Sequence, residues 1–246
     1  MAGDGRRFAE VGYTMPKPLI PVAGVPMVVR AVKDLPEAER VVFVVRDEHV
    51  RDHQIDRVLR EHLPNARIVT VQGLTAGQAV TVRRAAKALE PDWPVIVAAC
   101  DNTHLYDQAR LLDRMADPAV ECLVWTYRHD SRVLVNPRQH GWVRVDGTRA
   151  LEVSCKKPLS DTPLGDHAVS GFFSFRSAGQ MVDAIDRMVA SERRVNNEFY
   201  MDVVPNVLLA AGQGVEVFEV YKYIGWGTPA DLEDFGRWER YFAQLR

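Results

Sequence analysis

Four short runs of consecutive apolar residues constrain the fold of this chain most strongly. They are VVFVVR, RIVTVQ, PVIVAAC and ECLVWTY, at residues 41–46, 67–72, 94–100 and 121–127. Such runs are typical of strands covered on both faces of a sheet. Segments with helical spacing of apolar residues separate them, at 48–63, 76–90 and 106–116. The alternation predicts a three-layer α/β/α fold around a mostly parallel, Rossmann-like sheet.

The pattern changes after about residue 130, where a smaller antiparallel or mixed portion is expected. Its predicted strands are 141–145, 149–157, 168–176 and 214–223, and its predicted helices are 178–192 and 199–212. Thr228, Pro229 and Asp231 have the pattern of a capped helix start, so a last helix is expected to begin there. We predict a single domain over 1–246, with a first part at 1–130 and a second part at 131–246 that includes the C-terminal helix.

Composition narrows the function classes. The 246 residues are 47% hydrophobic and 26% charged, with a net charge of -2, which gives no support to nucleic-acid binding. No apolar run approaches the ~18 residues of a membrane span, and the N-terminus has no signal-peptide core. The 3 cysteines show no CxxC spacing, which argues against a disulfide framework or a zinc site. We expect a cytoplasmic protein without nucleic-acid or membrane partners, in an oligomeric state that remains open.

The N-terminal stretch MAGDGRRF, followed by Lys17 between two prolines, concentrates glycine and positive charge. Gly3 and Gly5 allow a tight turn whose backbone N–H groups can bind phosphate oxygens. Arg6 and Arg7 can add charge-assisted contacts, and the flanking prolines restrict the backbone at Lys17. A phosphate-binding loop usually follows a strand, and none precedes these glycines. We therefore hypothesise that a short first strand is missing, through truncation or a misassigned start codon, which the intact mass of the native protein would test.

The pattern GxGxRF followed by PKPLIPVAGVPM closely resembles the signature of the nucleotidyltransferases that make nucleotide-activated sugars and phospho-alcohols. The matching residues are Ala2, Gly3, Gly5, Arg7, Phe8, Pro16, Lys17, Pro18, Leu19, Val22, Gly24, Pro26 and Met27. Arg6 departs from the pattern, because the family usually has Ser or Thr there. Later segments resemble family elements in the same order: KKP at 156–158, AVSG at 168–171, NNEFYMDVVPN at 196–206 and GTPADL at 227–232.

The resemblance implies that 1–130 is the nucleotide-binding part and 131–246 the substrate-binding part, and it implies a set of site residues. The residues implied to bind the nucleotide are Ala2, Gly3, Gly5, Arg6, Arg7, Gln72, Gly77 and Asp101. Gln72 and Gly77 have the spacing with which family members read a pyrimidine base. The residues implied to bind the second substrate are Gly141, Lys156, Lys157, Gly171 and Glu198, with the choice between the two lysines left open. Asp101 is implied to bind Mg²⁺.

The implied reaction joins the nucleoside monophosphate of an NTP to a phosphorylated small molecule and releases pyrophosphate. The attacking phosphate is already an anion, so catalysis requires positioning and charge neutralisation. The catalytic residues implied are Arg7 at the β- and γ-phosphates, Lys17 at the α-phosphate and Asp101 with Mg²⁺. A sugar 1-phosphate is the favoured acceptor, and CTP-dependent transfer to a phospho-alcohol or phosphonate is the alternative.

One departure leaves other functions open. The family often has a second metal-binding aspartate just before the GT of GTPADL, where this chain has Gly225. Asp202 is the candidate for a second metal ligand. A non-catalytic nucleotide-binding module is therefore an alternative, and a GT-A-like glycosyltransferase is another. A dehydrogenase GxGxxG motif would need glycine at the position of Phe8.

Some residues have simpler interpretations. His49, His53 and His62 lie on one predicted helix and are expected to form a surface face. Asp231 is expected to cap a helix. A packed position is at least as well supported for Trp226 as a substrate contact.

Overall fold

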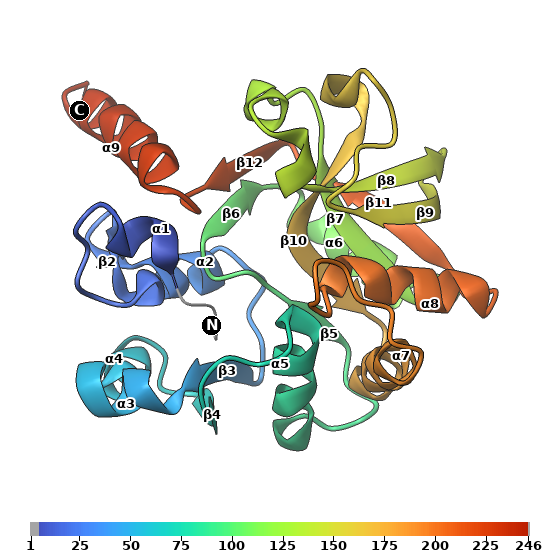
Figure 1. Ribbon diagram of the computed structural model, residues 1–246, viewed down its shortest axis with the longest axis horizontal. Helices are drawn as coiled ribbons and strands as arrows, with labels where there is room; N and C mark the ends of the chain where they lie inside the picture. The colour runs from blue at the N-terminus through green and yellow to red at the C-terminus, as the bar shows by residue number, and fades with distance from the viewer. Residues whose placement is uncertain (1–4, 246) are drawn as a thin grey trace. The chain divides into compact units, whose positions relative to one another are not determined.

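The computed structural model describes residues 5–245, so the predictions for Ala2 and Gly3 lie outside the described residues. The chain forms two compact units (Figure 1). The first unit comprises Met1–Leu74, Ala99–Leu105 and Tyr223–Arg246, and the second comprises Thr75–Ala98 and Tyr106–Lys222. Among the described residues, no helix has both the length and the apolar character needed to span a membrane. The prediction of a single domain over the whole chain stays a prediction.

The first unit combines short helices with three small sheets. Its helices are α1 (Arg6–Ala9), η1 (Lys17–Leu19), α2 (Met27–Lys33), α3 (Asp47–His53), α4 (Ile55–His62) and α9 (Pro229–Ala243). Its strands are β1 (Pro21–Val22), β2 (Val25–Pro26), β3 (Val41–Arg46), β4 (Ala66–Val71), β6 (Asn102–Leu105) and β12 (Lys222–Gly225). β3 pairs in parallel with β4, β1 pairs antiparallel with β2, and β6 pairs with β12.

The predicted helix over 48–63 is two helices. Gln54 has a φ of 50°, which is left-handed, and it separates α3 from α4. The break lets α4 place Ile55 and Leu59 in a core with Phe43 and Val45 of β3. A continuous helix over 48–63 is therefore wrong, because burial of the α4 face outweighs helical continuity.

A second core of the first unit anchors the N-terminal segment. Phe8, Ile20, Met27 and Trp226 are all buried together, and Phe235 of α9 packs against them. The N-terminus of α9 is as predicted: Thr228 accepts a hydrogen bond from the backbone N–H of Asp231 at 3.2 Å. The Thr228 hydroxyl also donates to the Asp231 carboxylate at 2.7 Å, so Asp231 caps the helix.

The second unit is built on a six-stranded sheet with strand order β5-β10-β7-β11-β9-β8. The strands are β5 (Val95–Val97), β7 (Cys122–Tyr127), β8 (Gly141–Asp146), β9 (Arg149–Cys155), β10 (His167–Phe175) and β11 (Val215–Glu219). The helices are α5 (Gln78–Ala85), η2 (Ala86–Ala88), α6 (Gln108–Ala116), η3 (Ser131–Leu134), η4 (Pro137–Gln139), η5 (Pro163–Gly165), α7 (Ala178–Ala190), η6 (Met201–Val203) and α8 (Val204–Ala210).

The mixed α/β class is as predicted, but the sheet of the second unit has less parallel pairing than the apolar runs indicated. β7 and β11 pair in parallel, whereas β10 runs antiparallel to β5, β7 and β8. Sequence periodicity does not show that β10, which comes later in the chain, inserts between β5 and β7. The predicted strand 214–223 is likewise two strands, because β11 joins this sheet and β12 pairs with β6.

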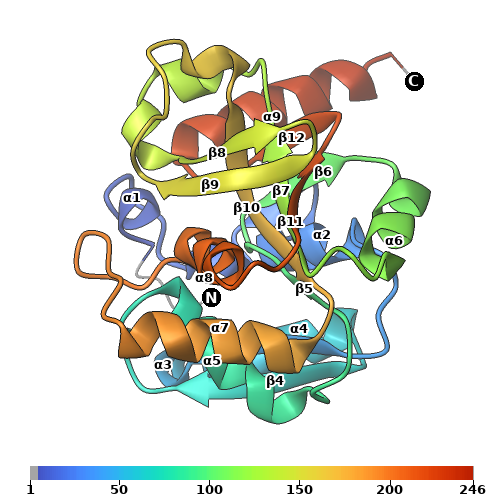
Figure 2. The same ribbon diagram turned by 90° about the vertical axis from the view of Figure 1, so that its right-hand side faces the viewer.

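Two helices complete the core of the second unit. α7 and α8 lie side by side in both views (Figures 1 and 2). Met181, Ile185 and Met188 of α7 are fully buried with Val204 and Leu208 of α8. Fully burying a side chain of this size contributes about 1.5–3 kcal/mol, so these positions carry much of the unit's stability.

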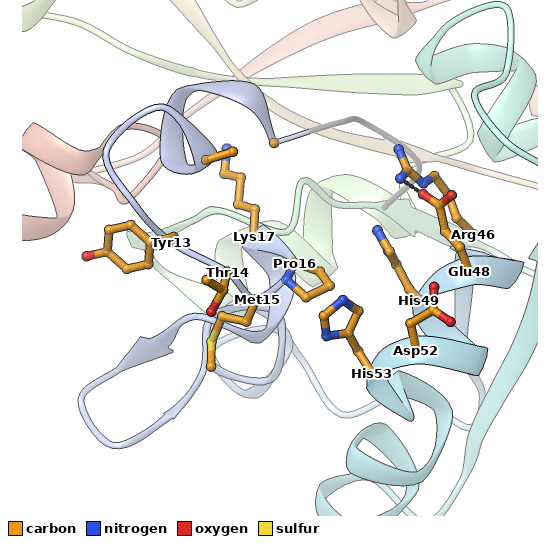
Figure 3. Close-up of a pocket in the computed structure, with 12 residues that line it drawn as sticks. Tyr13, Thr14, Met15, Pro16, Lys17, Arg46, Glu48, His49, Asp52 and His53 are labelled. Atoms are coloured by element: carbon orange, nitrogen blue, oxygen red, sulfur yellow. Dashed lines mark ion pairs between the residues drawn. The ribbon is translucent and has the colours of Figure 1, made fainter.

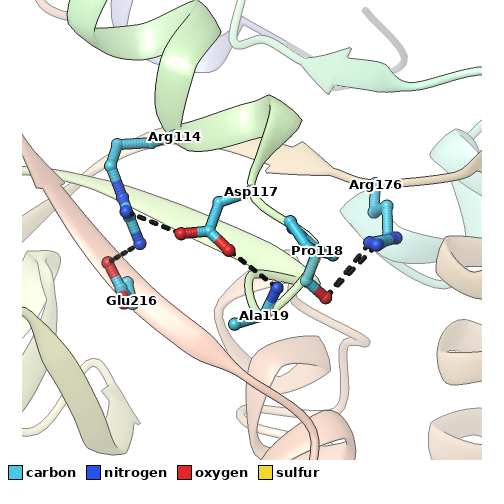
Figure 4. Close-up of polar contacts among 6 residues, drawn as sticks. All are labelled: Arg114, Asp117, Pro118, Ala119, Arg176 and Glu216. Carbon is cyan, nitrogen blue, oxygen red and sulfur yellow. Dashed lines mark hydrogen bonds and ion pairs between the residues drawn. The ribbon is translucent and has the colours of Figure 1, made fainter.

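The turn that leads into β7 is tied to β11 by polar contacts (Figure 4). Arg114 donates to Asp117 and to Glu216 of β11, both at 2.9 Å. Asp117 accepts from the backbone N–H of Ala119 at 2.8 Å, and Arg176 donates to the Pro118 carbonyl at 3.1 Å. The turn therefore holds β7 in register with its parallel neighbour.

Gly214, just before β11, is the point of closest approach to this turn. A Cβ on Gly214 would lie 1.9 Å from the Ala119 carbonyl oxygen. We expect Gly214→Ala to lower the free energy of unfolding by about 3 kcal/mol, because the backbone must shift to relieve the collision. Gly165→Ala is the control, since a Cβ there meets nothing within 4 Å. Urea unfolding of both variants measures the effect, and equal stabilities would contradict the assignment.

Candidate active site

Lys17 is the centre of the candidate site in the first unit. It opens η1 between Pro16 and Pro18, and its ammonium group forms an ion pair with the Asp101 carboxylate. The same ammonium donates to the Gly227 carbonyl at 3.1 Å and lies 5.6 Å from the centroid of the Phe8 ring. Three segments that are distant in sequence thus meet at one side chain. The structure brings the predicted residues Lys17 and Asp101 together.

The environment of Lys17 favours its charged form. Burial alone would lower the pKa of the ammonium group, but the charge and hydrogen bond of Asp101, together with Cys100, outweigh burial and raise it. The cation is therefore present at neutral pH. Both partners are partly buried, with 19% and 25% of their side chains exposed, so solvent screens the pair less than it would at the surface.

The predicted phosphate loop enters this site at Gly5. Gly5 has a φ of 63°, a left-handed conformation that favours glycine, and precedes the short helix α1. Arg6 and Arg7 on α1 are exposed, whereas the next residue, Phe8, is buried in the core. The two arginines thus remain accessible while Phe8 fixes their helix.

Asp101 does not directly follow a strand, because β5 ends at Val97 and not at residue 100 as the apolar run predicted. Its carbonyl accepts from the backbone N–H of Trp226 at 2.8 Å. A Cβ on Gly227 would lie 3.3 Å from the Asp101 carboxylate, so the glycine keeps space open beside that group. Among the described residues, no group of three or more His, Cys, Asp or Glu could hold a metal ion by protein ligands alone. One accessible carboxylate still suits Mg²⁺, which combines one or two carboxylates with substrate phosphates.

The structure shows what lies beside Gly225, where the family often has an acid. A Cβ on Gly225 would lie 2.7 Å from Cε1 and 2.9 Å from the hydroxyl oxygen of Tyr223. The Tyr223 ring therefore occupies the space where a side chain at 225 would begin. The next residue, Trp226, is fully buried and stacks edge-on with Phe235 at 5.6 Å, so it is a packed residue.

Gln72 and Gly77 belong to different units. Gln72 is exposed after β4 in the first unit. Gly77 precedes α5 in the second, with a φ of 127°, and a Cβ there would lie 2.5 Å from the Phe199 backbone nitrogen. Gly77 therefore has a structural reason to be glycine, and base recognition by the two residues stays a prediction.

A cluster in the second unit contains four of the predicted substrate and metal residues: Gly141, Lys156, Glu198 and Asp202. A Cβ on Gly141 would lie 2.3 Å from the Asp202 carboxylate oxygen, so any larger residue here would have to displace that carboxylate. Asp202 also accepts a hydrogen bond from the Cys155 thiol. Burial raises the pKa of Asp202 from 3.8 to about 6, against the opposing effects of Lys156 and Cys155. Its role as a metal ligand stays a prediction.

The two adjacent lysines differ in environment. Lys156 has a φ of 56°, and its ammonium lies 5.0 Å from the centroid of the Tyr200 ring. Lys157 is exposed. The Tyr200 hydroxyl donates to the exposed Glu198, and burial together with that contact raises the pKa of Tyr200. Lys156 is therefore the lysine that belongs to the cluster. Tyr200 and Cys155 are members that sequence reasoning missed, because only tertiary contacts bring them there.

Gly171, the remaining predicted substrate residue, lies inside β10. Its φ is 88°, and the register with β7 shifts between Val169 and Phe173. A left-handed φ favours glycine, so Gly171 has a structural role in this β-bulge.

The predicted surface face of histidines is wrong for one member. His49 is 7% exposed, and burial, followed by Arg46 and His53, lowers its pKa to about 4. In the structure α3 begins directly after β3, and His49 near the start of α3 faces the Gly5–Lys17 segment across a pocket (Figure 3). The sequence feature that could have indicated this burial is the position of His49, three residues after the end of β3.

The raised pKa of Asp202 predicts pH-dependent stability. Its folded pKa exceeds its unfolded value, so its contribution to stability is full below about 3.8 and is lost as pH rises through about 6. Relative to Asp202→Asn, the wild-type free energy of unfolding should fall by about 2–3 kcal/mol between pH 4 and pH 7.5. Urea unfolding across this range measures the difference. Cys155→Ala removes a donor to the carboxylate and should steepen the profile, whereas parallel wild-type and Asp202→Asn profiles would contradict the assignment.

Comparisons with known proteins agree with the fold. The chain superposes on a nucleoside-diphosphate-sugar pyrophosphorylase from Vibrio cholerae RC9 with a TM-score of 0.76 and 19% identity, covering 96% of this chain and 98% of that one. An inositol-1-phosphate CTP transferase from T. maritima gives a TM-score of 0.71 and 17% identity, with coverages of 96% and 91%. A Bacillus anthracis protein assigned as a glucose-1-phosphate thymidylyltransferase gives 0.75 and 17%, with coverages of 97% and 92%.

These structural likenesses show the fold, and the sequence itself shows the family. No curated protein sequence matches the chain significantly. A family model matches residues 1–191, the segment that contains Lys17, Asp101, Gly141 and Lys156. The chain belongs to the family of MobA-like NTP transferase domains.

Proposed function

We propose that this chain transfers the nucleoside monophosphate of a pyrimidine NTP to a sugar 1-phosphate and releases pyrophosphate. The observation that carries the proposal is the contact of Lys17 with Asp101 and the Gly227 carbonyl. A charged ammonium, fixed between two prolines beside a carboxylate, provides the positioned charge that nucleotidyl transfer needs. We further propose that both units act as one domain, in the cytoplasm, where the free thiols of Cys100, Cys122 and Cys155 would persist.

In this proposal the acceptor phosphate attacks the α-phosphorus in line, and the bond to the β-phosphate oxygen breaks. The attacking oxygen is already anionic, so no general base is required. Lys17 binds the α-phosphate and stabilises the charge that develops there. The exposed Arg7 on α1 binds the β- and γ-phosphates with the loop amides around Gly5.

We propose that Asp101 holds Mg²⁺ together with phosphate oxygens of the NTP. The open space that Gly227 leaves beside the carboxylate supports this assignment. When bound, the ion neutralises phosphate charge during transfer. Because Lys17 pairs with the same carboxylate in the structure, the ammonium and the ion would share the Asp101 group when substrate is present.

The proposed substrate class is supported by the structural neighbours, and the residue proposed to bind the acceptor phosphate is supported by its environment. The neighbouring structures include proteins named for nucleoside-diphosphate sugars and for inositol 1-phosphate with CTP. We assign the acceptor phosphate to Lys156, because Lys156 belongs to the Asp202 and Tyr200 cluster whereas Lys157 is exposed. Transfer from CTP to a phospho-alcohol or phosphonate is the alternative within the same reaction class.

The first test is pyrophosphate release with Mg²⁺. CTP, UTP, dTTP, ATP and GTP are crossed against sugar 1-phosphates, inositol 1-phosphate, phosphocholine and aminoethylphosphonate. We expect one pyrimidine NTP and one acceptor to turn over. Lys17→Ala and Asp101→Asn should each lower kcat about 10²–10³-fold, because each removes charge at the reacting phosphates. Lys33→Ala, an exposed lysine of the same unit, should have no effect.

The same assay separates the other functions. A glycosyltransferase would consume a finished nucleotide sugar and release no pyrophosphate. A nucleotide-binding module would bind an NTP in calorimetry and turn over no pair, and Lys17→Ala would then change binding alone. Either result would exclude the proposed reaction.

The acceptor assignment gives a separate prediction. Lys156→Ala should raise the KM for the acceptor about 10-fold or more and leave the KM for the NTP unchanged, since a charge-assisted contact to phosphate is lost. Lys157→Ala is the matched control and should leave both constants unchanged. Steady-state kinetics with each substrate varied in turn provide the measurement, and the reverse ranking of the two lysines would contradict the assignment.

A further inference from the structure

The C-terminal helix α9 of the first unit leaves most of its surface exposed (Figure 1). Its first half contacts the unit, where Leu232 and Phe235 pack, partly buried, against the core that contains Trp226. All described residues from 237 to 245 are exposed. A helix in a protein gains most of its stability by packing an apolar face, not from helix propensity. The second half of α9 is therefore incompletely packed in a single copy of the chain.

Large apolar side chains gather on the exposed half of α9. Trp238, Tyr241 and Phe242 are 56%, 53% and 56% exposed, and Leu245 is 66% exposed. The Trp238 and Phe242 rings stack with centroids 6.1 Å apart, and the Tyr241 ring lies edge-on to Trp238 at 6.1 Å. The backbone N–H of Leu245 donates to the Phe242 carbonyl at 3.3 Å, so the helical turn continues to Leu245. These side chains form one contiguous apolar patch, which is typical of an interaction surface.

The spacing of the apolar residues suits a second copy of the same helix. Intervals of 3, 4 and 3 residues, the a/d spacing of a coiled coil, separate Phe235, Trp238, Phe242 and Leu245. The series reads the same in both directions about residue 240. In an antiparallel pair, Trp238 of each copy would therefore lie opposite Phe242 of the other copy. Phe235 would lie opposite Leu245 in the same way. Such a self-complementary patch is what a two-fold interface requires.

The charges along α9 favour the same antiparallel arrangement. The first half is acidic and the second half is net positive, with Asp231, Glu233 and Asp234 in the first and Arg237, Glu239 and Arg240 in the second. Antiparallel pairing brings the acidic half of each copy beside the basic half of the other and also opposes the two helix dipoles. Arg237 already donates to Glu233 within the helix at 2.8 Å. The charges therefore set the direction of the pair more than its affinity.

The exposed area suits a small interface. Because an aromatic side chain can bury 150–250 Å², three rings that are about half exposed offer on the order of 300 Å² in each copy. Leu245 and the aliphatic parts of the flanking charged side chains add to this area. The total is in the range of small, transient interfaces and below that of obligate dimers. We therefore expect association in the micromolar range.

We propose that α9 is a self-association surface, through which two copies of this chain pair antiparallel about a two-fold axis near residue 240. Trp238, Tyr241 and Phe242 form the centre of the interface, and the charged side chains of α9 form its rim. The inference is independent of the proposed reaction, because substrate binding and catalysis are assigned to residues outside α9.

Sedimentation velocity of the full chain over a range of micromolar concentrations tests the proposal. The wild-type protein should change from monomer to dimer as its concentration rises. Trp238→Glu should weaken dimerisation about 10³-fold, because a central aromatic side chain is lost from both copies. Ala230→Glu is the matched control, since it introduces the same charge at an exposed position at the start of α9, outside the apolar series. It should leave dimerisation unchanged.

Cross-linking with a short bis-maleimide tests the direction of the pair. In the antiparallel arrangement, the thiol introduced by Glu239→Cys lies close to the two-fold axis and to its own counterpart. The thiols introduced by Asp234→Cys are about 18 Å apart along the helix axes. Glu239→Cys should therefore cross-link and Asp234→Cys should not, with the wild-type protein and its 3 native cysteines as background. Equal cross-linking of the two variants would contradict the antiparallel arrangement.

Two results of the sedimentation experiment would overturn the proposal. One is a wild-type protein that stays monomeric, and a tryptophan fluorescence shift of that monomer with phosphatidylcholine vesicles would assign the patch to a membrane surface instead. The other is a dimer that Trp238→Glu leaves intact, since another surface would then form the contact. Thermal unfolding establishes that each variant is folded. If Trp238→Glu is unstable, Leu245→Glu, at the exposed end of the same series, decides.

Discussion

The ion pair of Lys17 and Asp101 is the interaction on which the candidate active site depends. It joins η1 to the segment after β5, and the Gly227 carbonyl adds the segment before α9. The backbones on either side of Lys17 and before α9 are fixed by one shared core, in which Phe8, Ile20 and Trp226 are buried together. The cation is thus held by packing as well as by charge, so little reorganisation is required when a phosphate binds.

The second unit also contains a partly neutralised carboxylate, that of Asp202, but here the carboxylate is buried and has a raised pKa. Asp202 lies against Gly141, where its carboxylate occupies the space of a side chain, and the same carboxylate interacts with Cys155 and Lys156. Burial makes this carboxylate easier to protonate, so the cluster carries an energetic cost near neutral pH. Such costs are found where a group is retained for function, which agrees with the assignment of Lys156 to the acceptor phosphate.

Local chemistry made part of this structure predictable. The apolar run of β3, the proline-flanked Lys17 and the Thr228–Asp231 cap depend on neighbouring residues, and each is where the sequence places it. Features that depend on contacts between distant residues could not be predicted from the sequence. The insertion of β10 between β5 and β7 and the approach of Asp202 to Gly141 depend on pairing across many residues. His49 is buried beside the Gly5–Lys17 segment, which is distant in sequence, and the break at Gln54 carries no glycine or proline signal.

The glycine at 225 changes the electrostatics expected of the proposed NTP site. The Tyr223 ring fills the space of a side chain there, so Asp101 supplies the carboxylate near Lys17 without an acid at 225. Fewer carboxylates near the triphosphate mean less repulsion of its charge, and the exposed Arg6 adds a cation at the loop. Binding of the polyanion in this protein would therefore depend more on side-chain cations and less on metal ligation than it would with a second acid present.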